Sequence, residues 1–171
     1  GVLNMFIGDA VERGAAHVVP GGVSPFDSIA CPAVGTSVAY VDGVRGGNVF
    51  VVTALGARRL AALMMGEEPP GAGETELTEL EVSAVGEAMN QMMAAAAGAT
   101  SAVLGQEVDI SAPQTRFFPS PETTVEAFEL SSYSTAAAFL ISGEPARLVQ
   151  LVPNAFVVKL TKAFANLAAE I

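Results

Sequence analysis

The sequence is poor in cysteine and histidine. It contains one cysteine, Cys31, and one histidine, His17, among 171 residues. A single cysteine excludes a disulfide within the chain and fits a reducing compartment, so we expect a cytoplasmic protein. One thiol and one imidazole are too few soft ligands for a structural zinc site. We therefore expect no metal centre.

Positive charge is also scarce. Eight lysine and arginine residues stand against 18 aspartate and glutamate residues, and the formal net charge is −10. Nucleic-acid binding requires a basic patch that neutralises phosphates, so this balance argues against a nucleic-acid partner. It favours a partner that exposes lysine or arginine around its own site.

No stretch of the chain has the composition of a membrane span. Hydrophobic residues make up 51% of the sequence, and the mean hydropathy is +0.46. The longest weakly polar run, residues 84–104, contains Glu87, Asn90 and Gln91. These side chains fit a helix packed within protein better than one inserted in a bilayer. At 171 residues, the chain suits a single domain.

What the sequence does contain is one long, well-marked helix. Thr78 and Glu81 form a capping box at its start, and Leu104 followed by Gly105 predicts its end. Successive residues of a helix are about 100° apart, and this projection separates two faces. We expect one face to pack on the core, and its residues are Val85, Met89, Met92, Met93 and Ala96.

The opposite face of this helix carries Ser83, Glu87 and Asn90, together with Ala94 and Ala97. A solvated helix face normally mixes charges, so a smooth face with one carboxylate and one amide indicates a docking surface. Glu87 alone needs no functional explanation, because glutamate is a good helix former. Asn90 is more informative, because asparagine is disfavoured inside helices.

The spacing of Ser83, Glu87 and Asn90, followed by Pro113, resembles the signature of the CheC/CheX/FliY family of chemotaxis phosphatases. The string LEVSAVGEAMNQMM is similar to the second active-site helix of FliY members. LAALMMG and VDISAP extend this likeness from residue 60 to residue 113. The resemblance implies that Glu87 and Asn90 are catalytic, with Ser83 and Pro113 in support.

Periodicity and turn residues predict the remaining elements. Before the long helix we expect a helix, a loop, a hairpin and a short helix, at residues 2–19, 21–32, 36–41 with 48–53, and 57–65. After it we expect a strand, a second hairpin and a final helix, at residues 108–112, 125–130 with 136–142, and 154–169. The order helix, connection, two strands, helix occurs twice, which indicates an internal duplication. The pattern alone predicts an α+β protein with an antiparallel sheet.

The family resemblance adds detail to this fold. It implies a single, internally duplicated CheC-like domain over residues 1–171, in which two pseudo-twofold halves share an antiparallel sheet with long helices packed on one face. The first half-repeat covers 1–66, an acidic linker 67–75, and the second half-repeat 76–171.

The family often carries a second Glu-x-x-Asn pair in its first half. Asn4 matches the asparagine of that pair, but Gly1 stands at the glutamate position and Asp27 at the proline position. We therefore expect a degenerate second site at Asn4, whose replacement should leave most activity in place.

The activity implied by the resemblance is hydrolysis of the aspartyl phosphate of a CheY-type response regulator. Asn90 is then expected to orient the attacking water, and Glu87 to pair with the regulator's active-site lysine. Mg²⁺ is expected on the regulator, so this chain needs no cofactor of its own. Other flagellar switch proteins are further expected partners, at the flagellar basal body and without membrane insertion. Two alternatives remain open: a non-catalytic structural domain of the flagellar switch complex, and a soluble CheC-type phosphatase.

Other candidate sites are weaker. His17 with Ser28 or Cys31 does not form a recognisable nucleophile and base, because the surrounding FDSIACP string matches no nucleophile elbow. The glycines of GVRGGN lack the lysine and hydroxyl residue of a phosphate-binding loop. The acidic residues between 67 and 87 lack the spacing of a calcium loop, and we expect them to form a solvated, negative surface.

Overall fold

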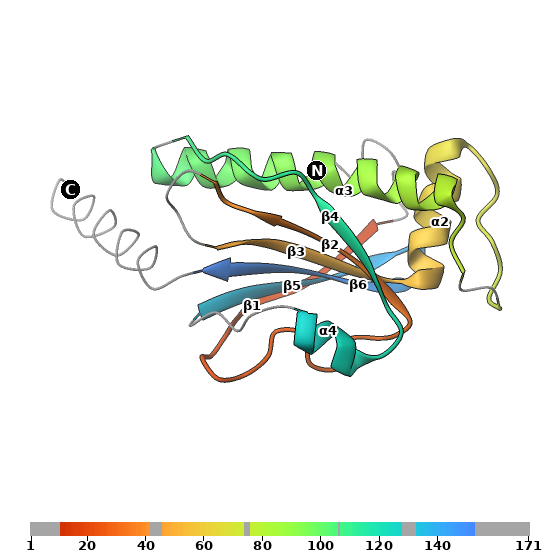
Figure 1. Cartoon of the computed structure of the whole chain (residues 1–171), viewed down its shortest axis with the longest axis horizontal. Helices are drawn as coiled ribbons and strands as arrows, with labels where there is room; N and C mark the ends of the chain where they lie inside the picture. Colours follow the sequence, from red (N-terminus) through yellow and green to blue (C-terminus); the bar gives the residue numbers. More distant parts are fainter. Residues whose placement is uncertain (1–10, 42–45, 74–75, 106, 128–132, 153–171) are drawn as a thin grey trace, which may run out of the picture.

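The computed structural model describes residues 11–41, 46–73, 76–105, 107–127 and 133–152. These residues form a six-stranded antiparallel sheet with two helices on one side of it (Figure 1). The strands are β1 (Val11–Val19), β2 (Ala33–Ala39), β3 (Gly47–Thr53), β4 (Gln114–Phe118), β5 (Tyr133–Ile141) and β6 (Glu144–Val152). The helices are α2 (Ala54–Met65), α3 (Glu79–Leu104) and α4 (Pro121–Ala127). This arrangement confirms the predicted α+β class.

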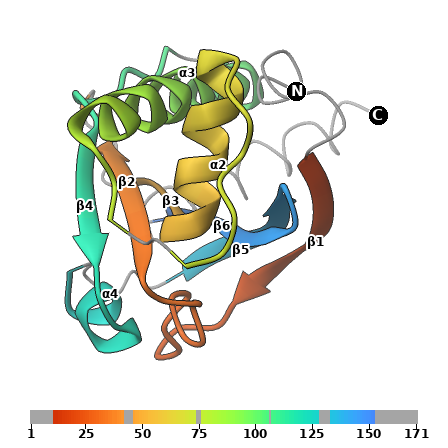
Figure 2. The same ribbon diagram turned by 90° about the vertical axis from the view of Figure 1, so that its right-hand side faces the viewer.

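The sheet has the strand order β1-β5-β6-β3-β2-β4. Figure 2 shows α2 and α3 on the same side of the sheet. Strand β3 lies inside the sheet and is buried on both faces. Its successive side chains point to opposite faces of the sheet. Phe50 and Val52 pack with the helices, whereas Val49 and Val51 pack on the other face with Phe26. The predicted hairpin of β2 and β3 is confirmed.

The expected core face of α3 is confirmed at its centre. Val85, Met89 and Met93 are at most 1% exposed and pack in one cluster with residues of α2 and the sheet. Met92 and Ala96, which we also expected there, are half-buried. Burying each large apolar side chain contributes about 1.5–3 kcal/mol, so this stripe is a main attachment of α3 to α2 and the sheet.

The caps confirm both predicted ends of α3 and the predicted C-terminal end of α2. The Thr78 N–H donates to Glu81 at 2.7 Å, and the Glu81 N–H donates to the Thr78 hydroxyl at 3.2 Å. Gly105 and Gly66 follow α3 and α2 in the left-handed region, with φ of 63° and 73°. Helix α2 begins earlier than predicted, directly after β3, because the Thr53 side chain caps it.

The helix predicted over residues 2–19 is wrong over Val11–Val19, which form β1 and pair antiparallel with β5. Residues 1–10 lie outside the described part. The register shifts between Arg13 and Ala16, and Gly14 lies so close to β5 that a Cβ there would be 3.0 Å from the Ala138 carbonyl oxygen. Such an irregular edge strand has no clear alternation, so its pairing was not visible in the sequence.

The strand predicted over 108–112 is also wrong. Only an isolated bridge between Tyr40 and Ile110 forms there, and the strand itself, β4, starts after Pro113. The Ser111 N–H donates to the Ala39 carbonyl at 2.8 Å, so this segment is held by single contacts and not by a ladder.

The second hairpin is formed by β5 and β6, not by residues 125–130 with 136–142. Val125 lies in α4, and residues 128–132 are outside the described part. Ser142 and Gly143 have φ of 50° and 80°, the positive values of a tight hairpin turn, so the predicted strand end at 142 was in fact the turn. The predicted helix over 154–169 lies outside the described residues, and the duplication remains a prediction.

Across the described ranges, none of the helices is both long enough and apolar enough to cross a membrane.

Candidate functional site

The N-terminal end of α3 is fixed to α2 by an ion pair. Arg58 donates to the Glu81 carboxylate at 2.9 Å, and the two side chains are 13% and 12% exposed. Burial opposes ionisation of Glu81, but hydrogen bonds from the Thr78 backbone and from Arg58 outweigh it and lower the pKa of Glu81. We expected Glu81 to belong to a solvated acidic surface. The ion pair with Arg58 shows that this expectation is wrong for Glu81.

The structure places Ser83, Glu87 and Asn90 on the solvent-facing side of α3. Ser83, Glu87 and the neighbouring Ala94 are exposed, and Asn90 is half-buried. We call these four residues the site face. Residues three or four apart on a helix have Cβ atoms about 5–6 Å apart, so the carboxylate and the amide can act on one bound partner.

The Glu87 carboxylate is oriented by its own helix. Gln91 donates from its side-chain amide to Glu87 Oε1 at 2.7 Å. Within the described residues, no cation lies within ion-pair distance of Glu87. Gln91 was not among the predicted site residues, although its spacing of four from Glu87 is the signal for such a contact. Glu87 is thus positioned and still able to bind a cation from outside.

The Asn90 amide makes no hydrogen bond with any described residue. An amide offers two donor hydrogens and an acceptor oxygen, and solvent or a ligand must satisfy those of Asn90. Its position in mid-helix has no capping role, because α3 begins at Glu79 and ends at Leu104. Asn90 therefore has no evident structural role in the part of the chain that the structure describes.

Beyond Ala94, the prediction for this face is wrong. Ala97, which we expected beside Asn90, is 4% exposed. Residues 107–111, the return segment, lie along this half of the helix. The Val108 N–H donates to the Ser101 hydroxyl at 2.9 Å, and that hydroxyl donates to the Ala97 carbonyl at 3.1 Å. The open part of the helix face therefore ends near Ala94.

Pro113 connects the return segment to β4. It is half-buried and directly precedes Gln114, which pairs with Ser37 of β2. Proline lacks a backbone N–H and fits the first position before a strand. Its predicted supporting role in the site remains a prediction.

The weaker candidates do not assemble into a site. His17 is exposed on β1, and Ser28 is exposed in the loop before β2. Burial raises the pKa of the Cys31 thiol, so at neutral pH the sulfur keeps its proton and is a poor nucleophile. Asn4 lies outside the described residues. No cluster of three or more histidine, cysteine or acidic side chains suited to a metal ion occurs in the described ranges.

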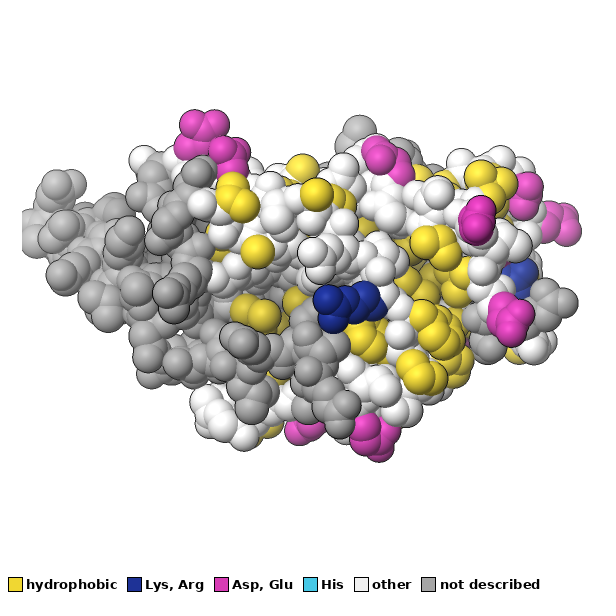
Figure 3. Space-filling view, viewed as in Figure 1, with side chains coloured by type: hydrophobic (Ala, Val, Ile, Leu, Met, Phe, Trp, Pro, Cys, Tyr) yellow, Lys and Arg dark blue, Asp and Glu magenta, His cyan; other side chains and the backbone are white. Residues whose placement is uncertain are grey.

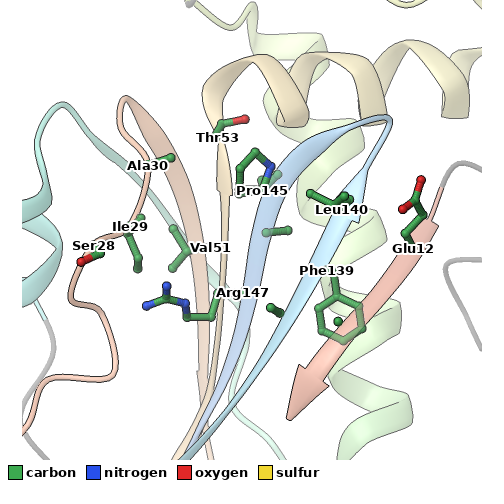
Figure 4. Close-up of a pocket in the computed structure, with 14 residues that line it drawn as sticks. Glu12, Ser28, Ile29, Ala30, Val51, Thr53, Phe139, Leu140, Pro145 and Arg147 are labelled. Carbon is green, nitrogen blue, oxygen red and sulfur yellow. The ribbon is translucent and has the colours of Figure 1, made fainter. Parts of the chain in front are cut away.

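A separate cavity of about 330 Å³ opens on the face of the sheet opposite α3 (Figure 4). Val51 and Leu140 are among its lining residues. Arg147 also lines it, but its guanidinium donates to the carbonyls of Pro25 and Asp27, both at 2.8 Å. Arg147 therefore holds the loop before β2 against the sheet, and the cavity lacks the features of a catalytic site.

Comparisons with known proteins point to the same helix. A model of the CheC-like family matches residues 80–115. The flagellar motor switch phosphatase FliY of Bacillus subtilis (strain 168) is 42% identical over 88 residues, which are 52% of this chain and 23% of that protein. The match thus spans about a quarter of that relative's length.

Two solved structures extend the similarity to nearly the whole chain. FliY of Thermotoga maritima matches with a TM-score of 0.70 and 27% identity, over 96% of this chain and 87% of that chain. A chain of the CheX–CheY–BeF₃–Mg²⁺ complex from Borrelia burgdorferi matches with a TM-score of 0.63 and 18% identity, over 90% and 91% of the two chains. The second match shows the fold alone. Together these findings confirm the resemblance to the CheC/CheX/FliY family that the spacing of Ser83, Glu87 and Asn90 predicts.

Proposed function

We propose that this chain is a phosphatase that hydrolyses the aspartyl phosphate of a CheY-type chemotaxis response regulator. The proposal is carried by one observation: Glu87 and Asn90 lie one turn apart on the open face of α3, inside the segment that matches the CheC-like family. The name of the FliY relative and the CheX–CheY complex among the fold matches support the choice of reaction and substrate.

The chemistry of this substrate requires little from the enzyme. An aspartyl phosphate is an acyl phosphate and hydrolyses unaided, so positioning of water and stabilisation of charge suffice to accelerate the reaction. Water is the nucleophile in this reaction, so neither Glu87 nor Asn90 needs to form a covalent intermediate. The phosphorus–oxygen bond to the aspartate breaks as water attacks, and the products are inorganic phosphate and the free carboxylate.

Asn90 is the residue suited to position the water. Its amide oxygen accepts a hydrogen bond from the water, while its NH₂ group donates to a phosphoryl oxygen or a neighbouring carbonyl. No described residue competes for these groups. Glutamine would place the same amide one methylene further out, and alanine would leave the water unordered.

Glu87 is the residue suited to bind the regulator. Its carboxylate would pair with the active-site lysine of the regulator and draw that lysine away from the phosphoryl group. Gln91 keeps one carboxylate oxygen oriented along the helix. The net charge of −10 favours approach of a partner that presents positive charge. Mg²⁺, which we expect on the regulator, would offset the negative charge of the phosphoryl group.

We further propose that the protein acts in the cytoplasm at the flagellar switch, as the name of the FliY relative suggests. The test is the decay of a phosphorylated CheY-type regulator, measured as phosphate release with and without the chain. We expect decay to accelerate in proportion to chain concentration until saturation. An unchanged decay rate despite demonstrated binding would mean that the chain is a non-catalytic structural domain.

A further inference from the structure

Three large apolar side chains lie exposed near the N-terminal end of α3. Leu80, Val82 and Phe117 are 65%, 39% and 53% exposed, and we call them the apolar patch. Single exposed apolar residues are ordinary on protein surfaces. These three are unusual because two of them line one groove and the third lies on the face that carries Glu87.

The groove lies between α3 and β4 and has a volume of about 410 Å³. Val82 lines one side and Phe117 the other, with Leu77 and Val34 also in its lining. Phe117 points toward α3 because it pairs in register with Val34, which packs in the core under the helices. Figure 3 shows hydrophobic side chains gathered in this region of the surface.

Leu80 continues the site face, whereas Val82 points about 160° away from Leu80 around the helix and lines the groove. Leu80 precedes Ser83 by three residues and Glu87 by seven, so the three side chains lie along one side of the helix. At 1.5 Å per residue, Leu80 and Asn90 are about 15 Å apart along the axis. A partner the size of a single domain that binds Glu87 and Asn90 therefore reaches Leu80 and the groove.

The site face alone is too small and too polar for a stable complex. A stable interface buries about 800 Å² on each partner, and its centre is rich in aromatic and large apolar residues. The site face offers a serine, a carboxylate, an amide and an alanine along one stripe of helix. We infer that the regulator docked on Glu87 and Asn90 also covers the apolar patch, with Phe117 as its main apolar anchor. This inference rests on the proposed function.

The apolar patch then contributes affinity and takes no part in the chemical step. Its side chains touch the regulator equally before and during hydrolysis, so truncating them raises KM and leaves kcat unchanged. We expect Phe117→Ala and Leu80→Ala each to raise Kd and KM by about 5- to 30-fold, the range for an interface anchor. Both side chains are more than half exposed, so the fold should survive.

The experiment measures two quantities for wild type, Phe117→Ala, Leu80→Ala and a control, Val18→Ala. Val18 is 67% exposed on β1, at the other edge of the sheet. The first quantity is Kd for the regulator activated with beryllium fluoride, which mimics the phosphoryl group. The second is the steady-state kcat and KM for phosphate release. We expect Val18→Ala to behave as wild type in both.

If wild type is active and both patch variants match Val18→Ala in Kd and KM, the inference is wrong while the proposed function stands. If Phe117→Ala changes the sedimentation of the chain alone without changing Kd, the patch is an interface between copies of the chain, and the inference is again wrong. A wild type that neither binds nor hydrolyses overturns the proposed function and the inference together.

Discussion

The two halves of α3 differ in what lies against their outer sides. In the first half, Ser83 and Glu87 are exposed to solvent. In the second half, Ala97 is 4% exposed, and the Ser101 hydroxyl accepts a hydrogen bond from Val108 of the return segment. The return segment is therefore attached to the second half of the helix at Ser101, whereas Glu87 in the first half is open to solvent.

This difference assigns the halves distinct roles. The first half can present a carboxylate and an amide to a partner because its neighbouring strand, β4, leaves a groove beside it. The second half is a structural support, because the Ser101 hydroxyl on this side donates a hydrogen bond to the Ala97 carbonyl. Substitutions in the first half should therefore affect regulator binding, and substitutions in the second half should affect stability.

The largest expected effect is that of Glu87→Lys on complex formation. Removing one member of a desolvated ion pair costs about 2–5 kcal/mol, and lysine adds repulsion with the regulator's lysine. Titration of activated regulator should show almost no binding, while Glu87→Gln retains weak binding. The melting temperature should stay that of wild type, because Glu87 is exposed. Wild-type affinity in Glu87→Lys would make Glu87 an ordinary solvated residue.

Glu81→Gln should lower stability, because the ion pair with Arg58 anchors the first half. Glutamine still completes the capping box, so the change isolates the charge. We expect the free energy of unfolding, measured in urea at pH 7, to fall by about 1.5–3 kcal/mol. The folded-state pKa of Glu81 is lowered, so its contribution is present above the usual glutamate pKa and is lost as pH falls through the folded value. If the difference in unfolding free energy between Glu81→Gln and wild type were as large at pH 3 as at pH 7, the assigned role of the Glu81 charge would be wrong.

Ser101→Ala should destabilise the fold by about 1 kcal/mol, because the Val108 N–H loses its acceptor. Phosphatase activity at saturating regulator should not change. Ser83→Ala is the matched control for stability, since Ser83 is exposed on the first half of the same helix. Equal unfolding midpoints for the two variants would show that the return segment does not depend on Ser101.

The smallest expected effect is that of Gln91→Ala, which releases the oriented Glu87 carboxylate. A side-chain pair of this spacing contributes about 0.2–0.5 kcal/mol, so affinity for the regulator should fall about twofold. The effect should vanish in a Glu87→Gln background, as a double-mutant cycle would reveal. An undiminished effect in that background would assign Gln91 a direct contact with the regulator.

Local signals in the sequence were sufficient for the helices that matter most. The Thr78 and Glu81 capping box and Gly105 predicted both ends of α3, and the β-branched run before Thr53 predicted β3. These features depend on residues close together in the chain. Three of the four motif positions, Ser83, Glu87 and Asn90, likewise lie on one helix, so Glu87 and Asn90 could be selected before their exposure was known.

Non-local contacts account for what the sequence did not predict. Strand β1 exists because β5 pairs with it, and its glycine-containing bulge hides the alternation that would mark a strand. The contact of the return segment with α3, a hydrogen bond from the Val108 N–H to the Ser101 hydroxyl, is one that helical projection cannot represent. Gln91 could have been found from its spacing to Glu87, whereas the groove beside Phe117 depends on the pairing of β4 with β2.

The most direct test of the account is the split between binding and hydrolysis in Asn90→Ala. If Asn90 positions the attacking water, the rate of phosphate release at a saturating concentration of the chain should fall by on the order of 100-fold, as for a misplaced reactant. Kd for regulator activated with beryllium fluoride should change little, and stability should be equal or slightly higher, because alanine is the better helix former. Wild-type phosphate release from Asn90→Ala would contradict the account.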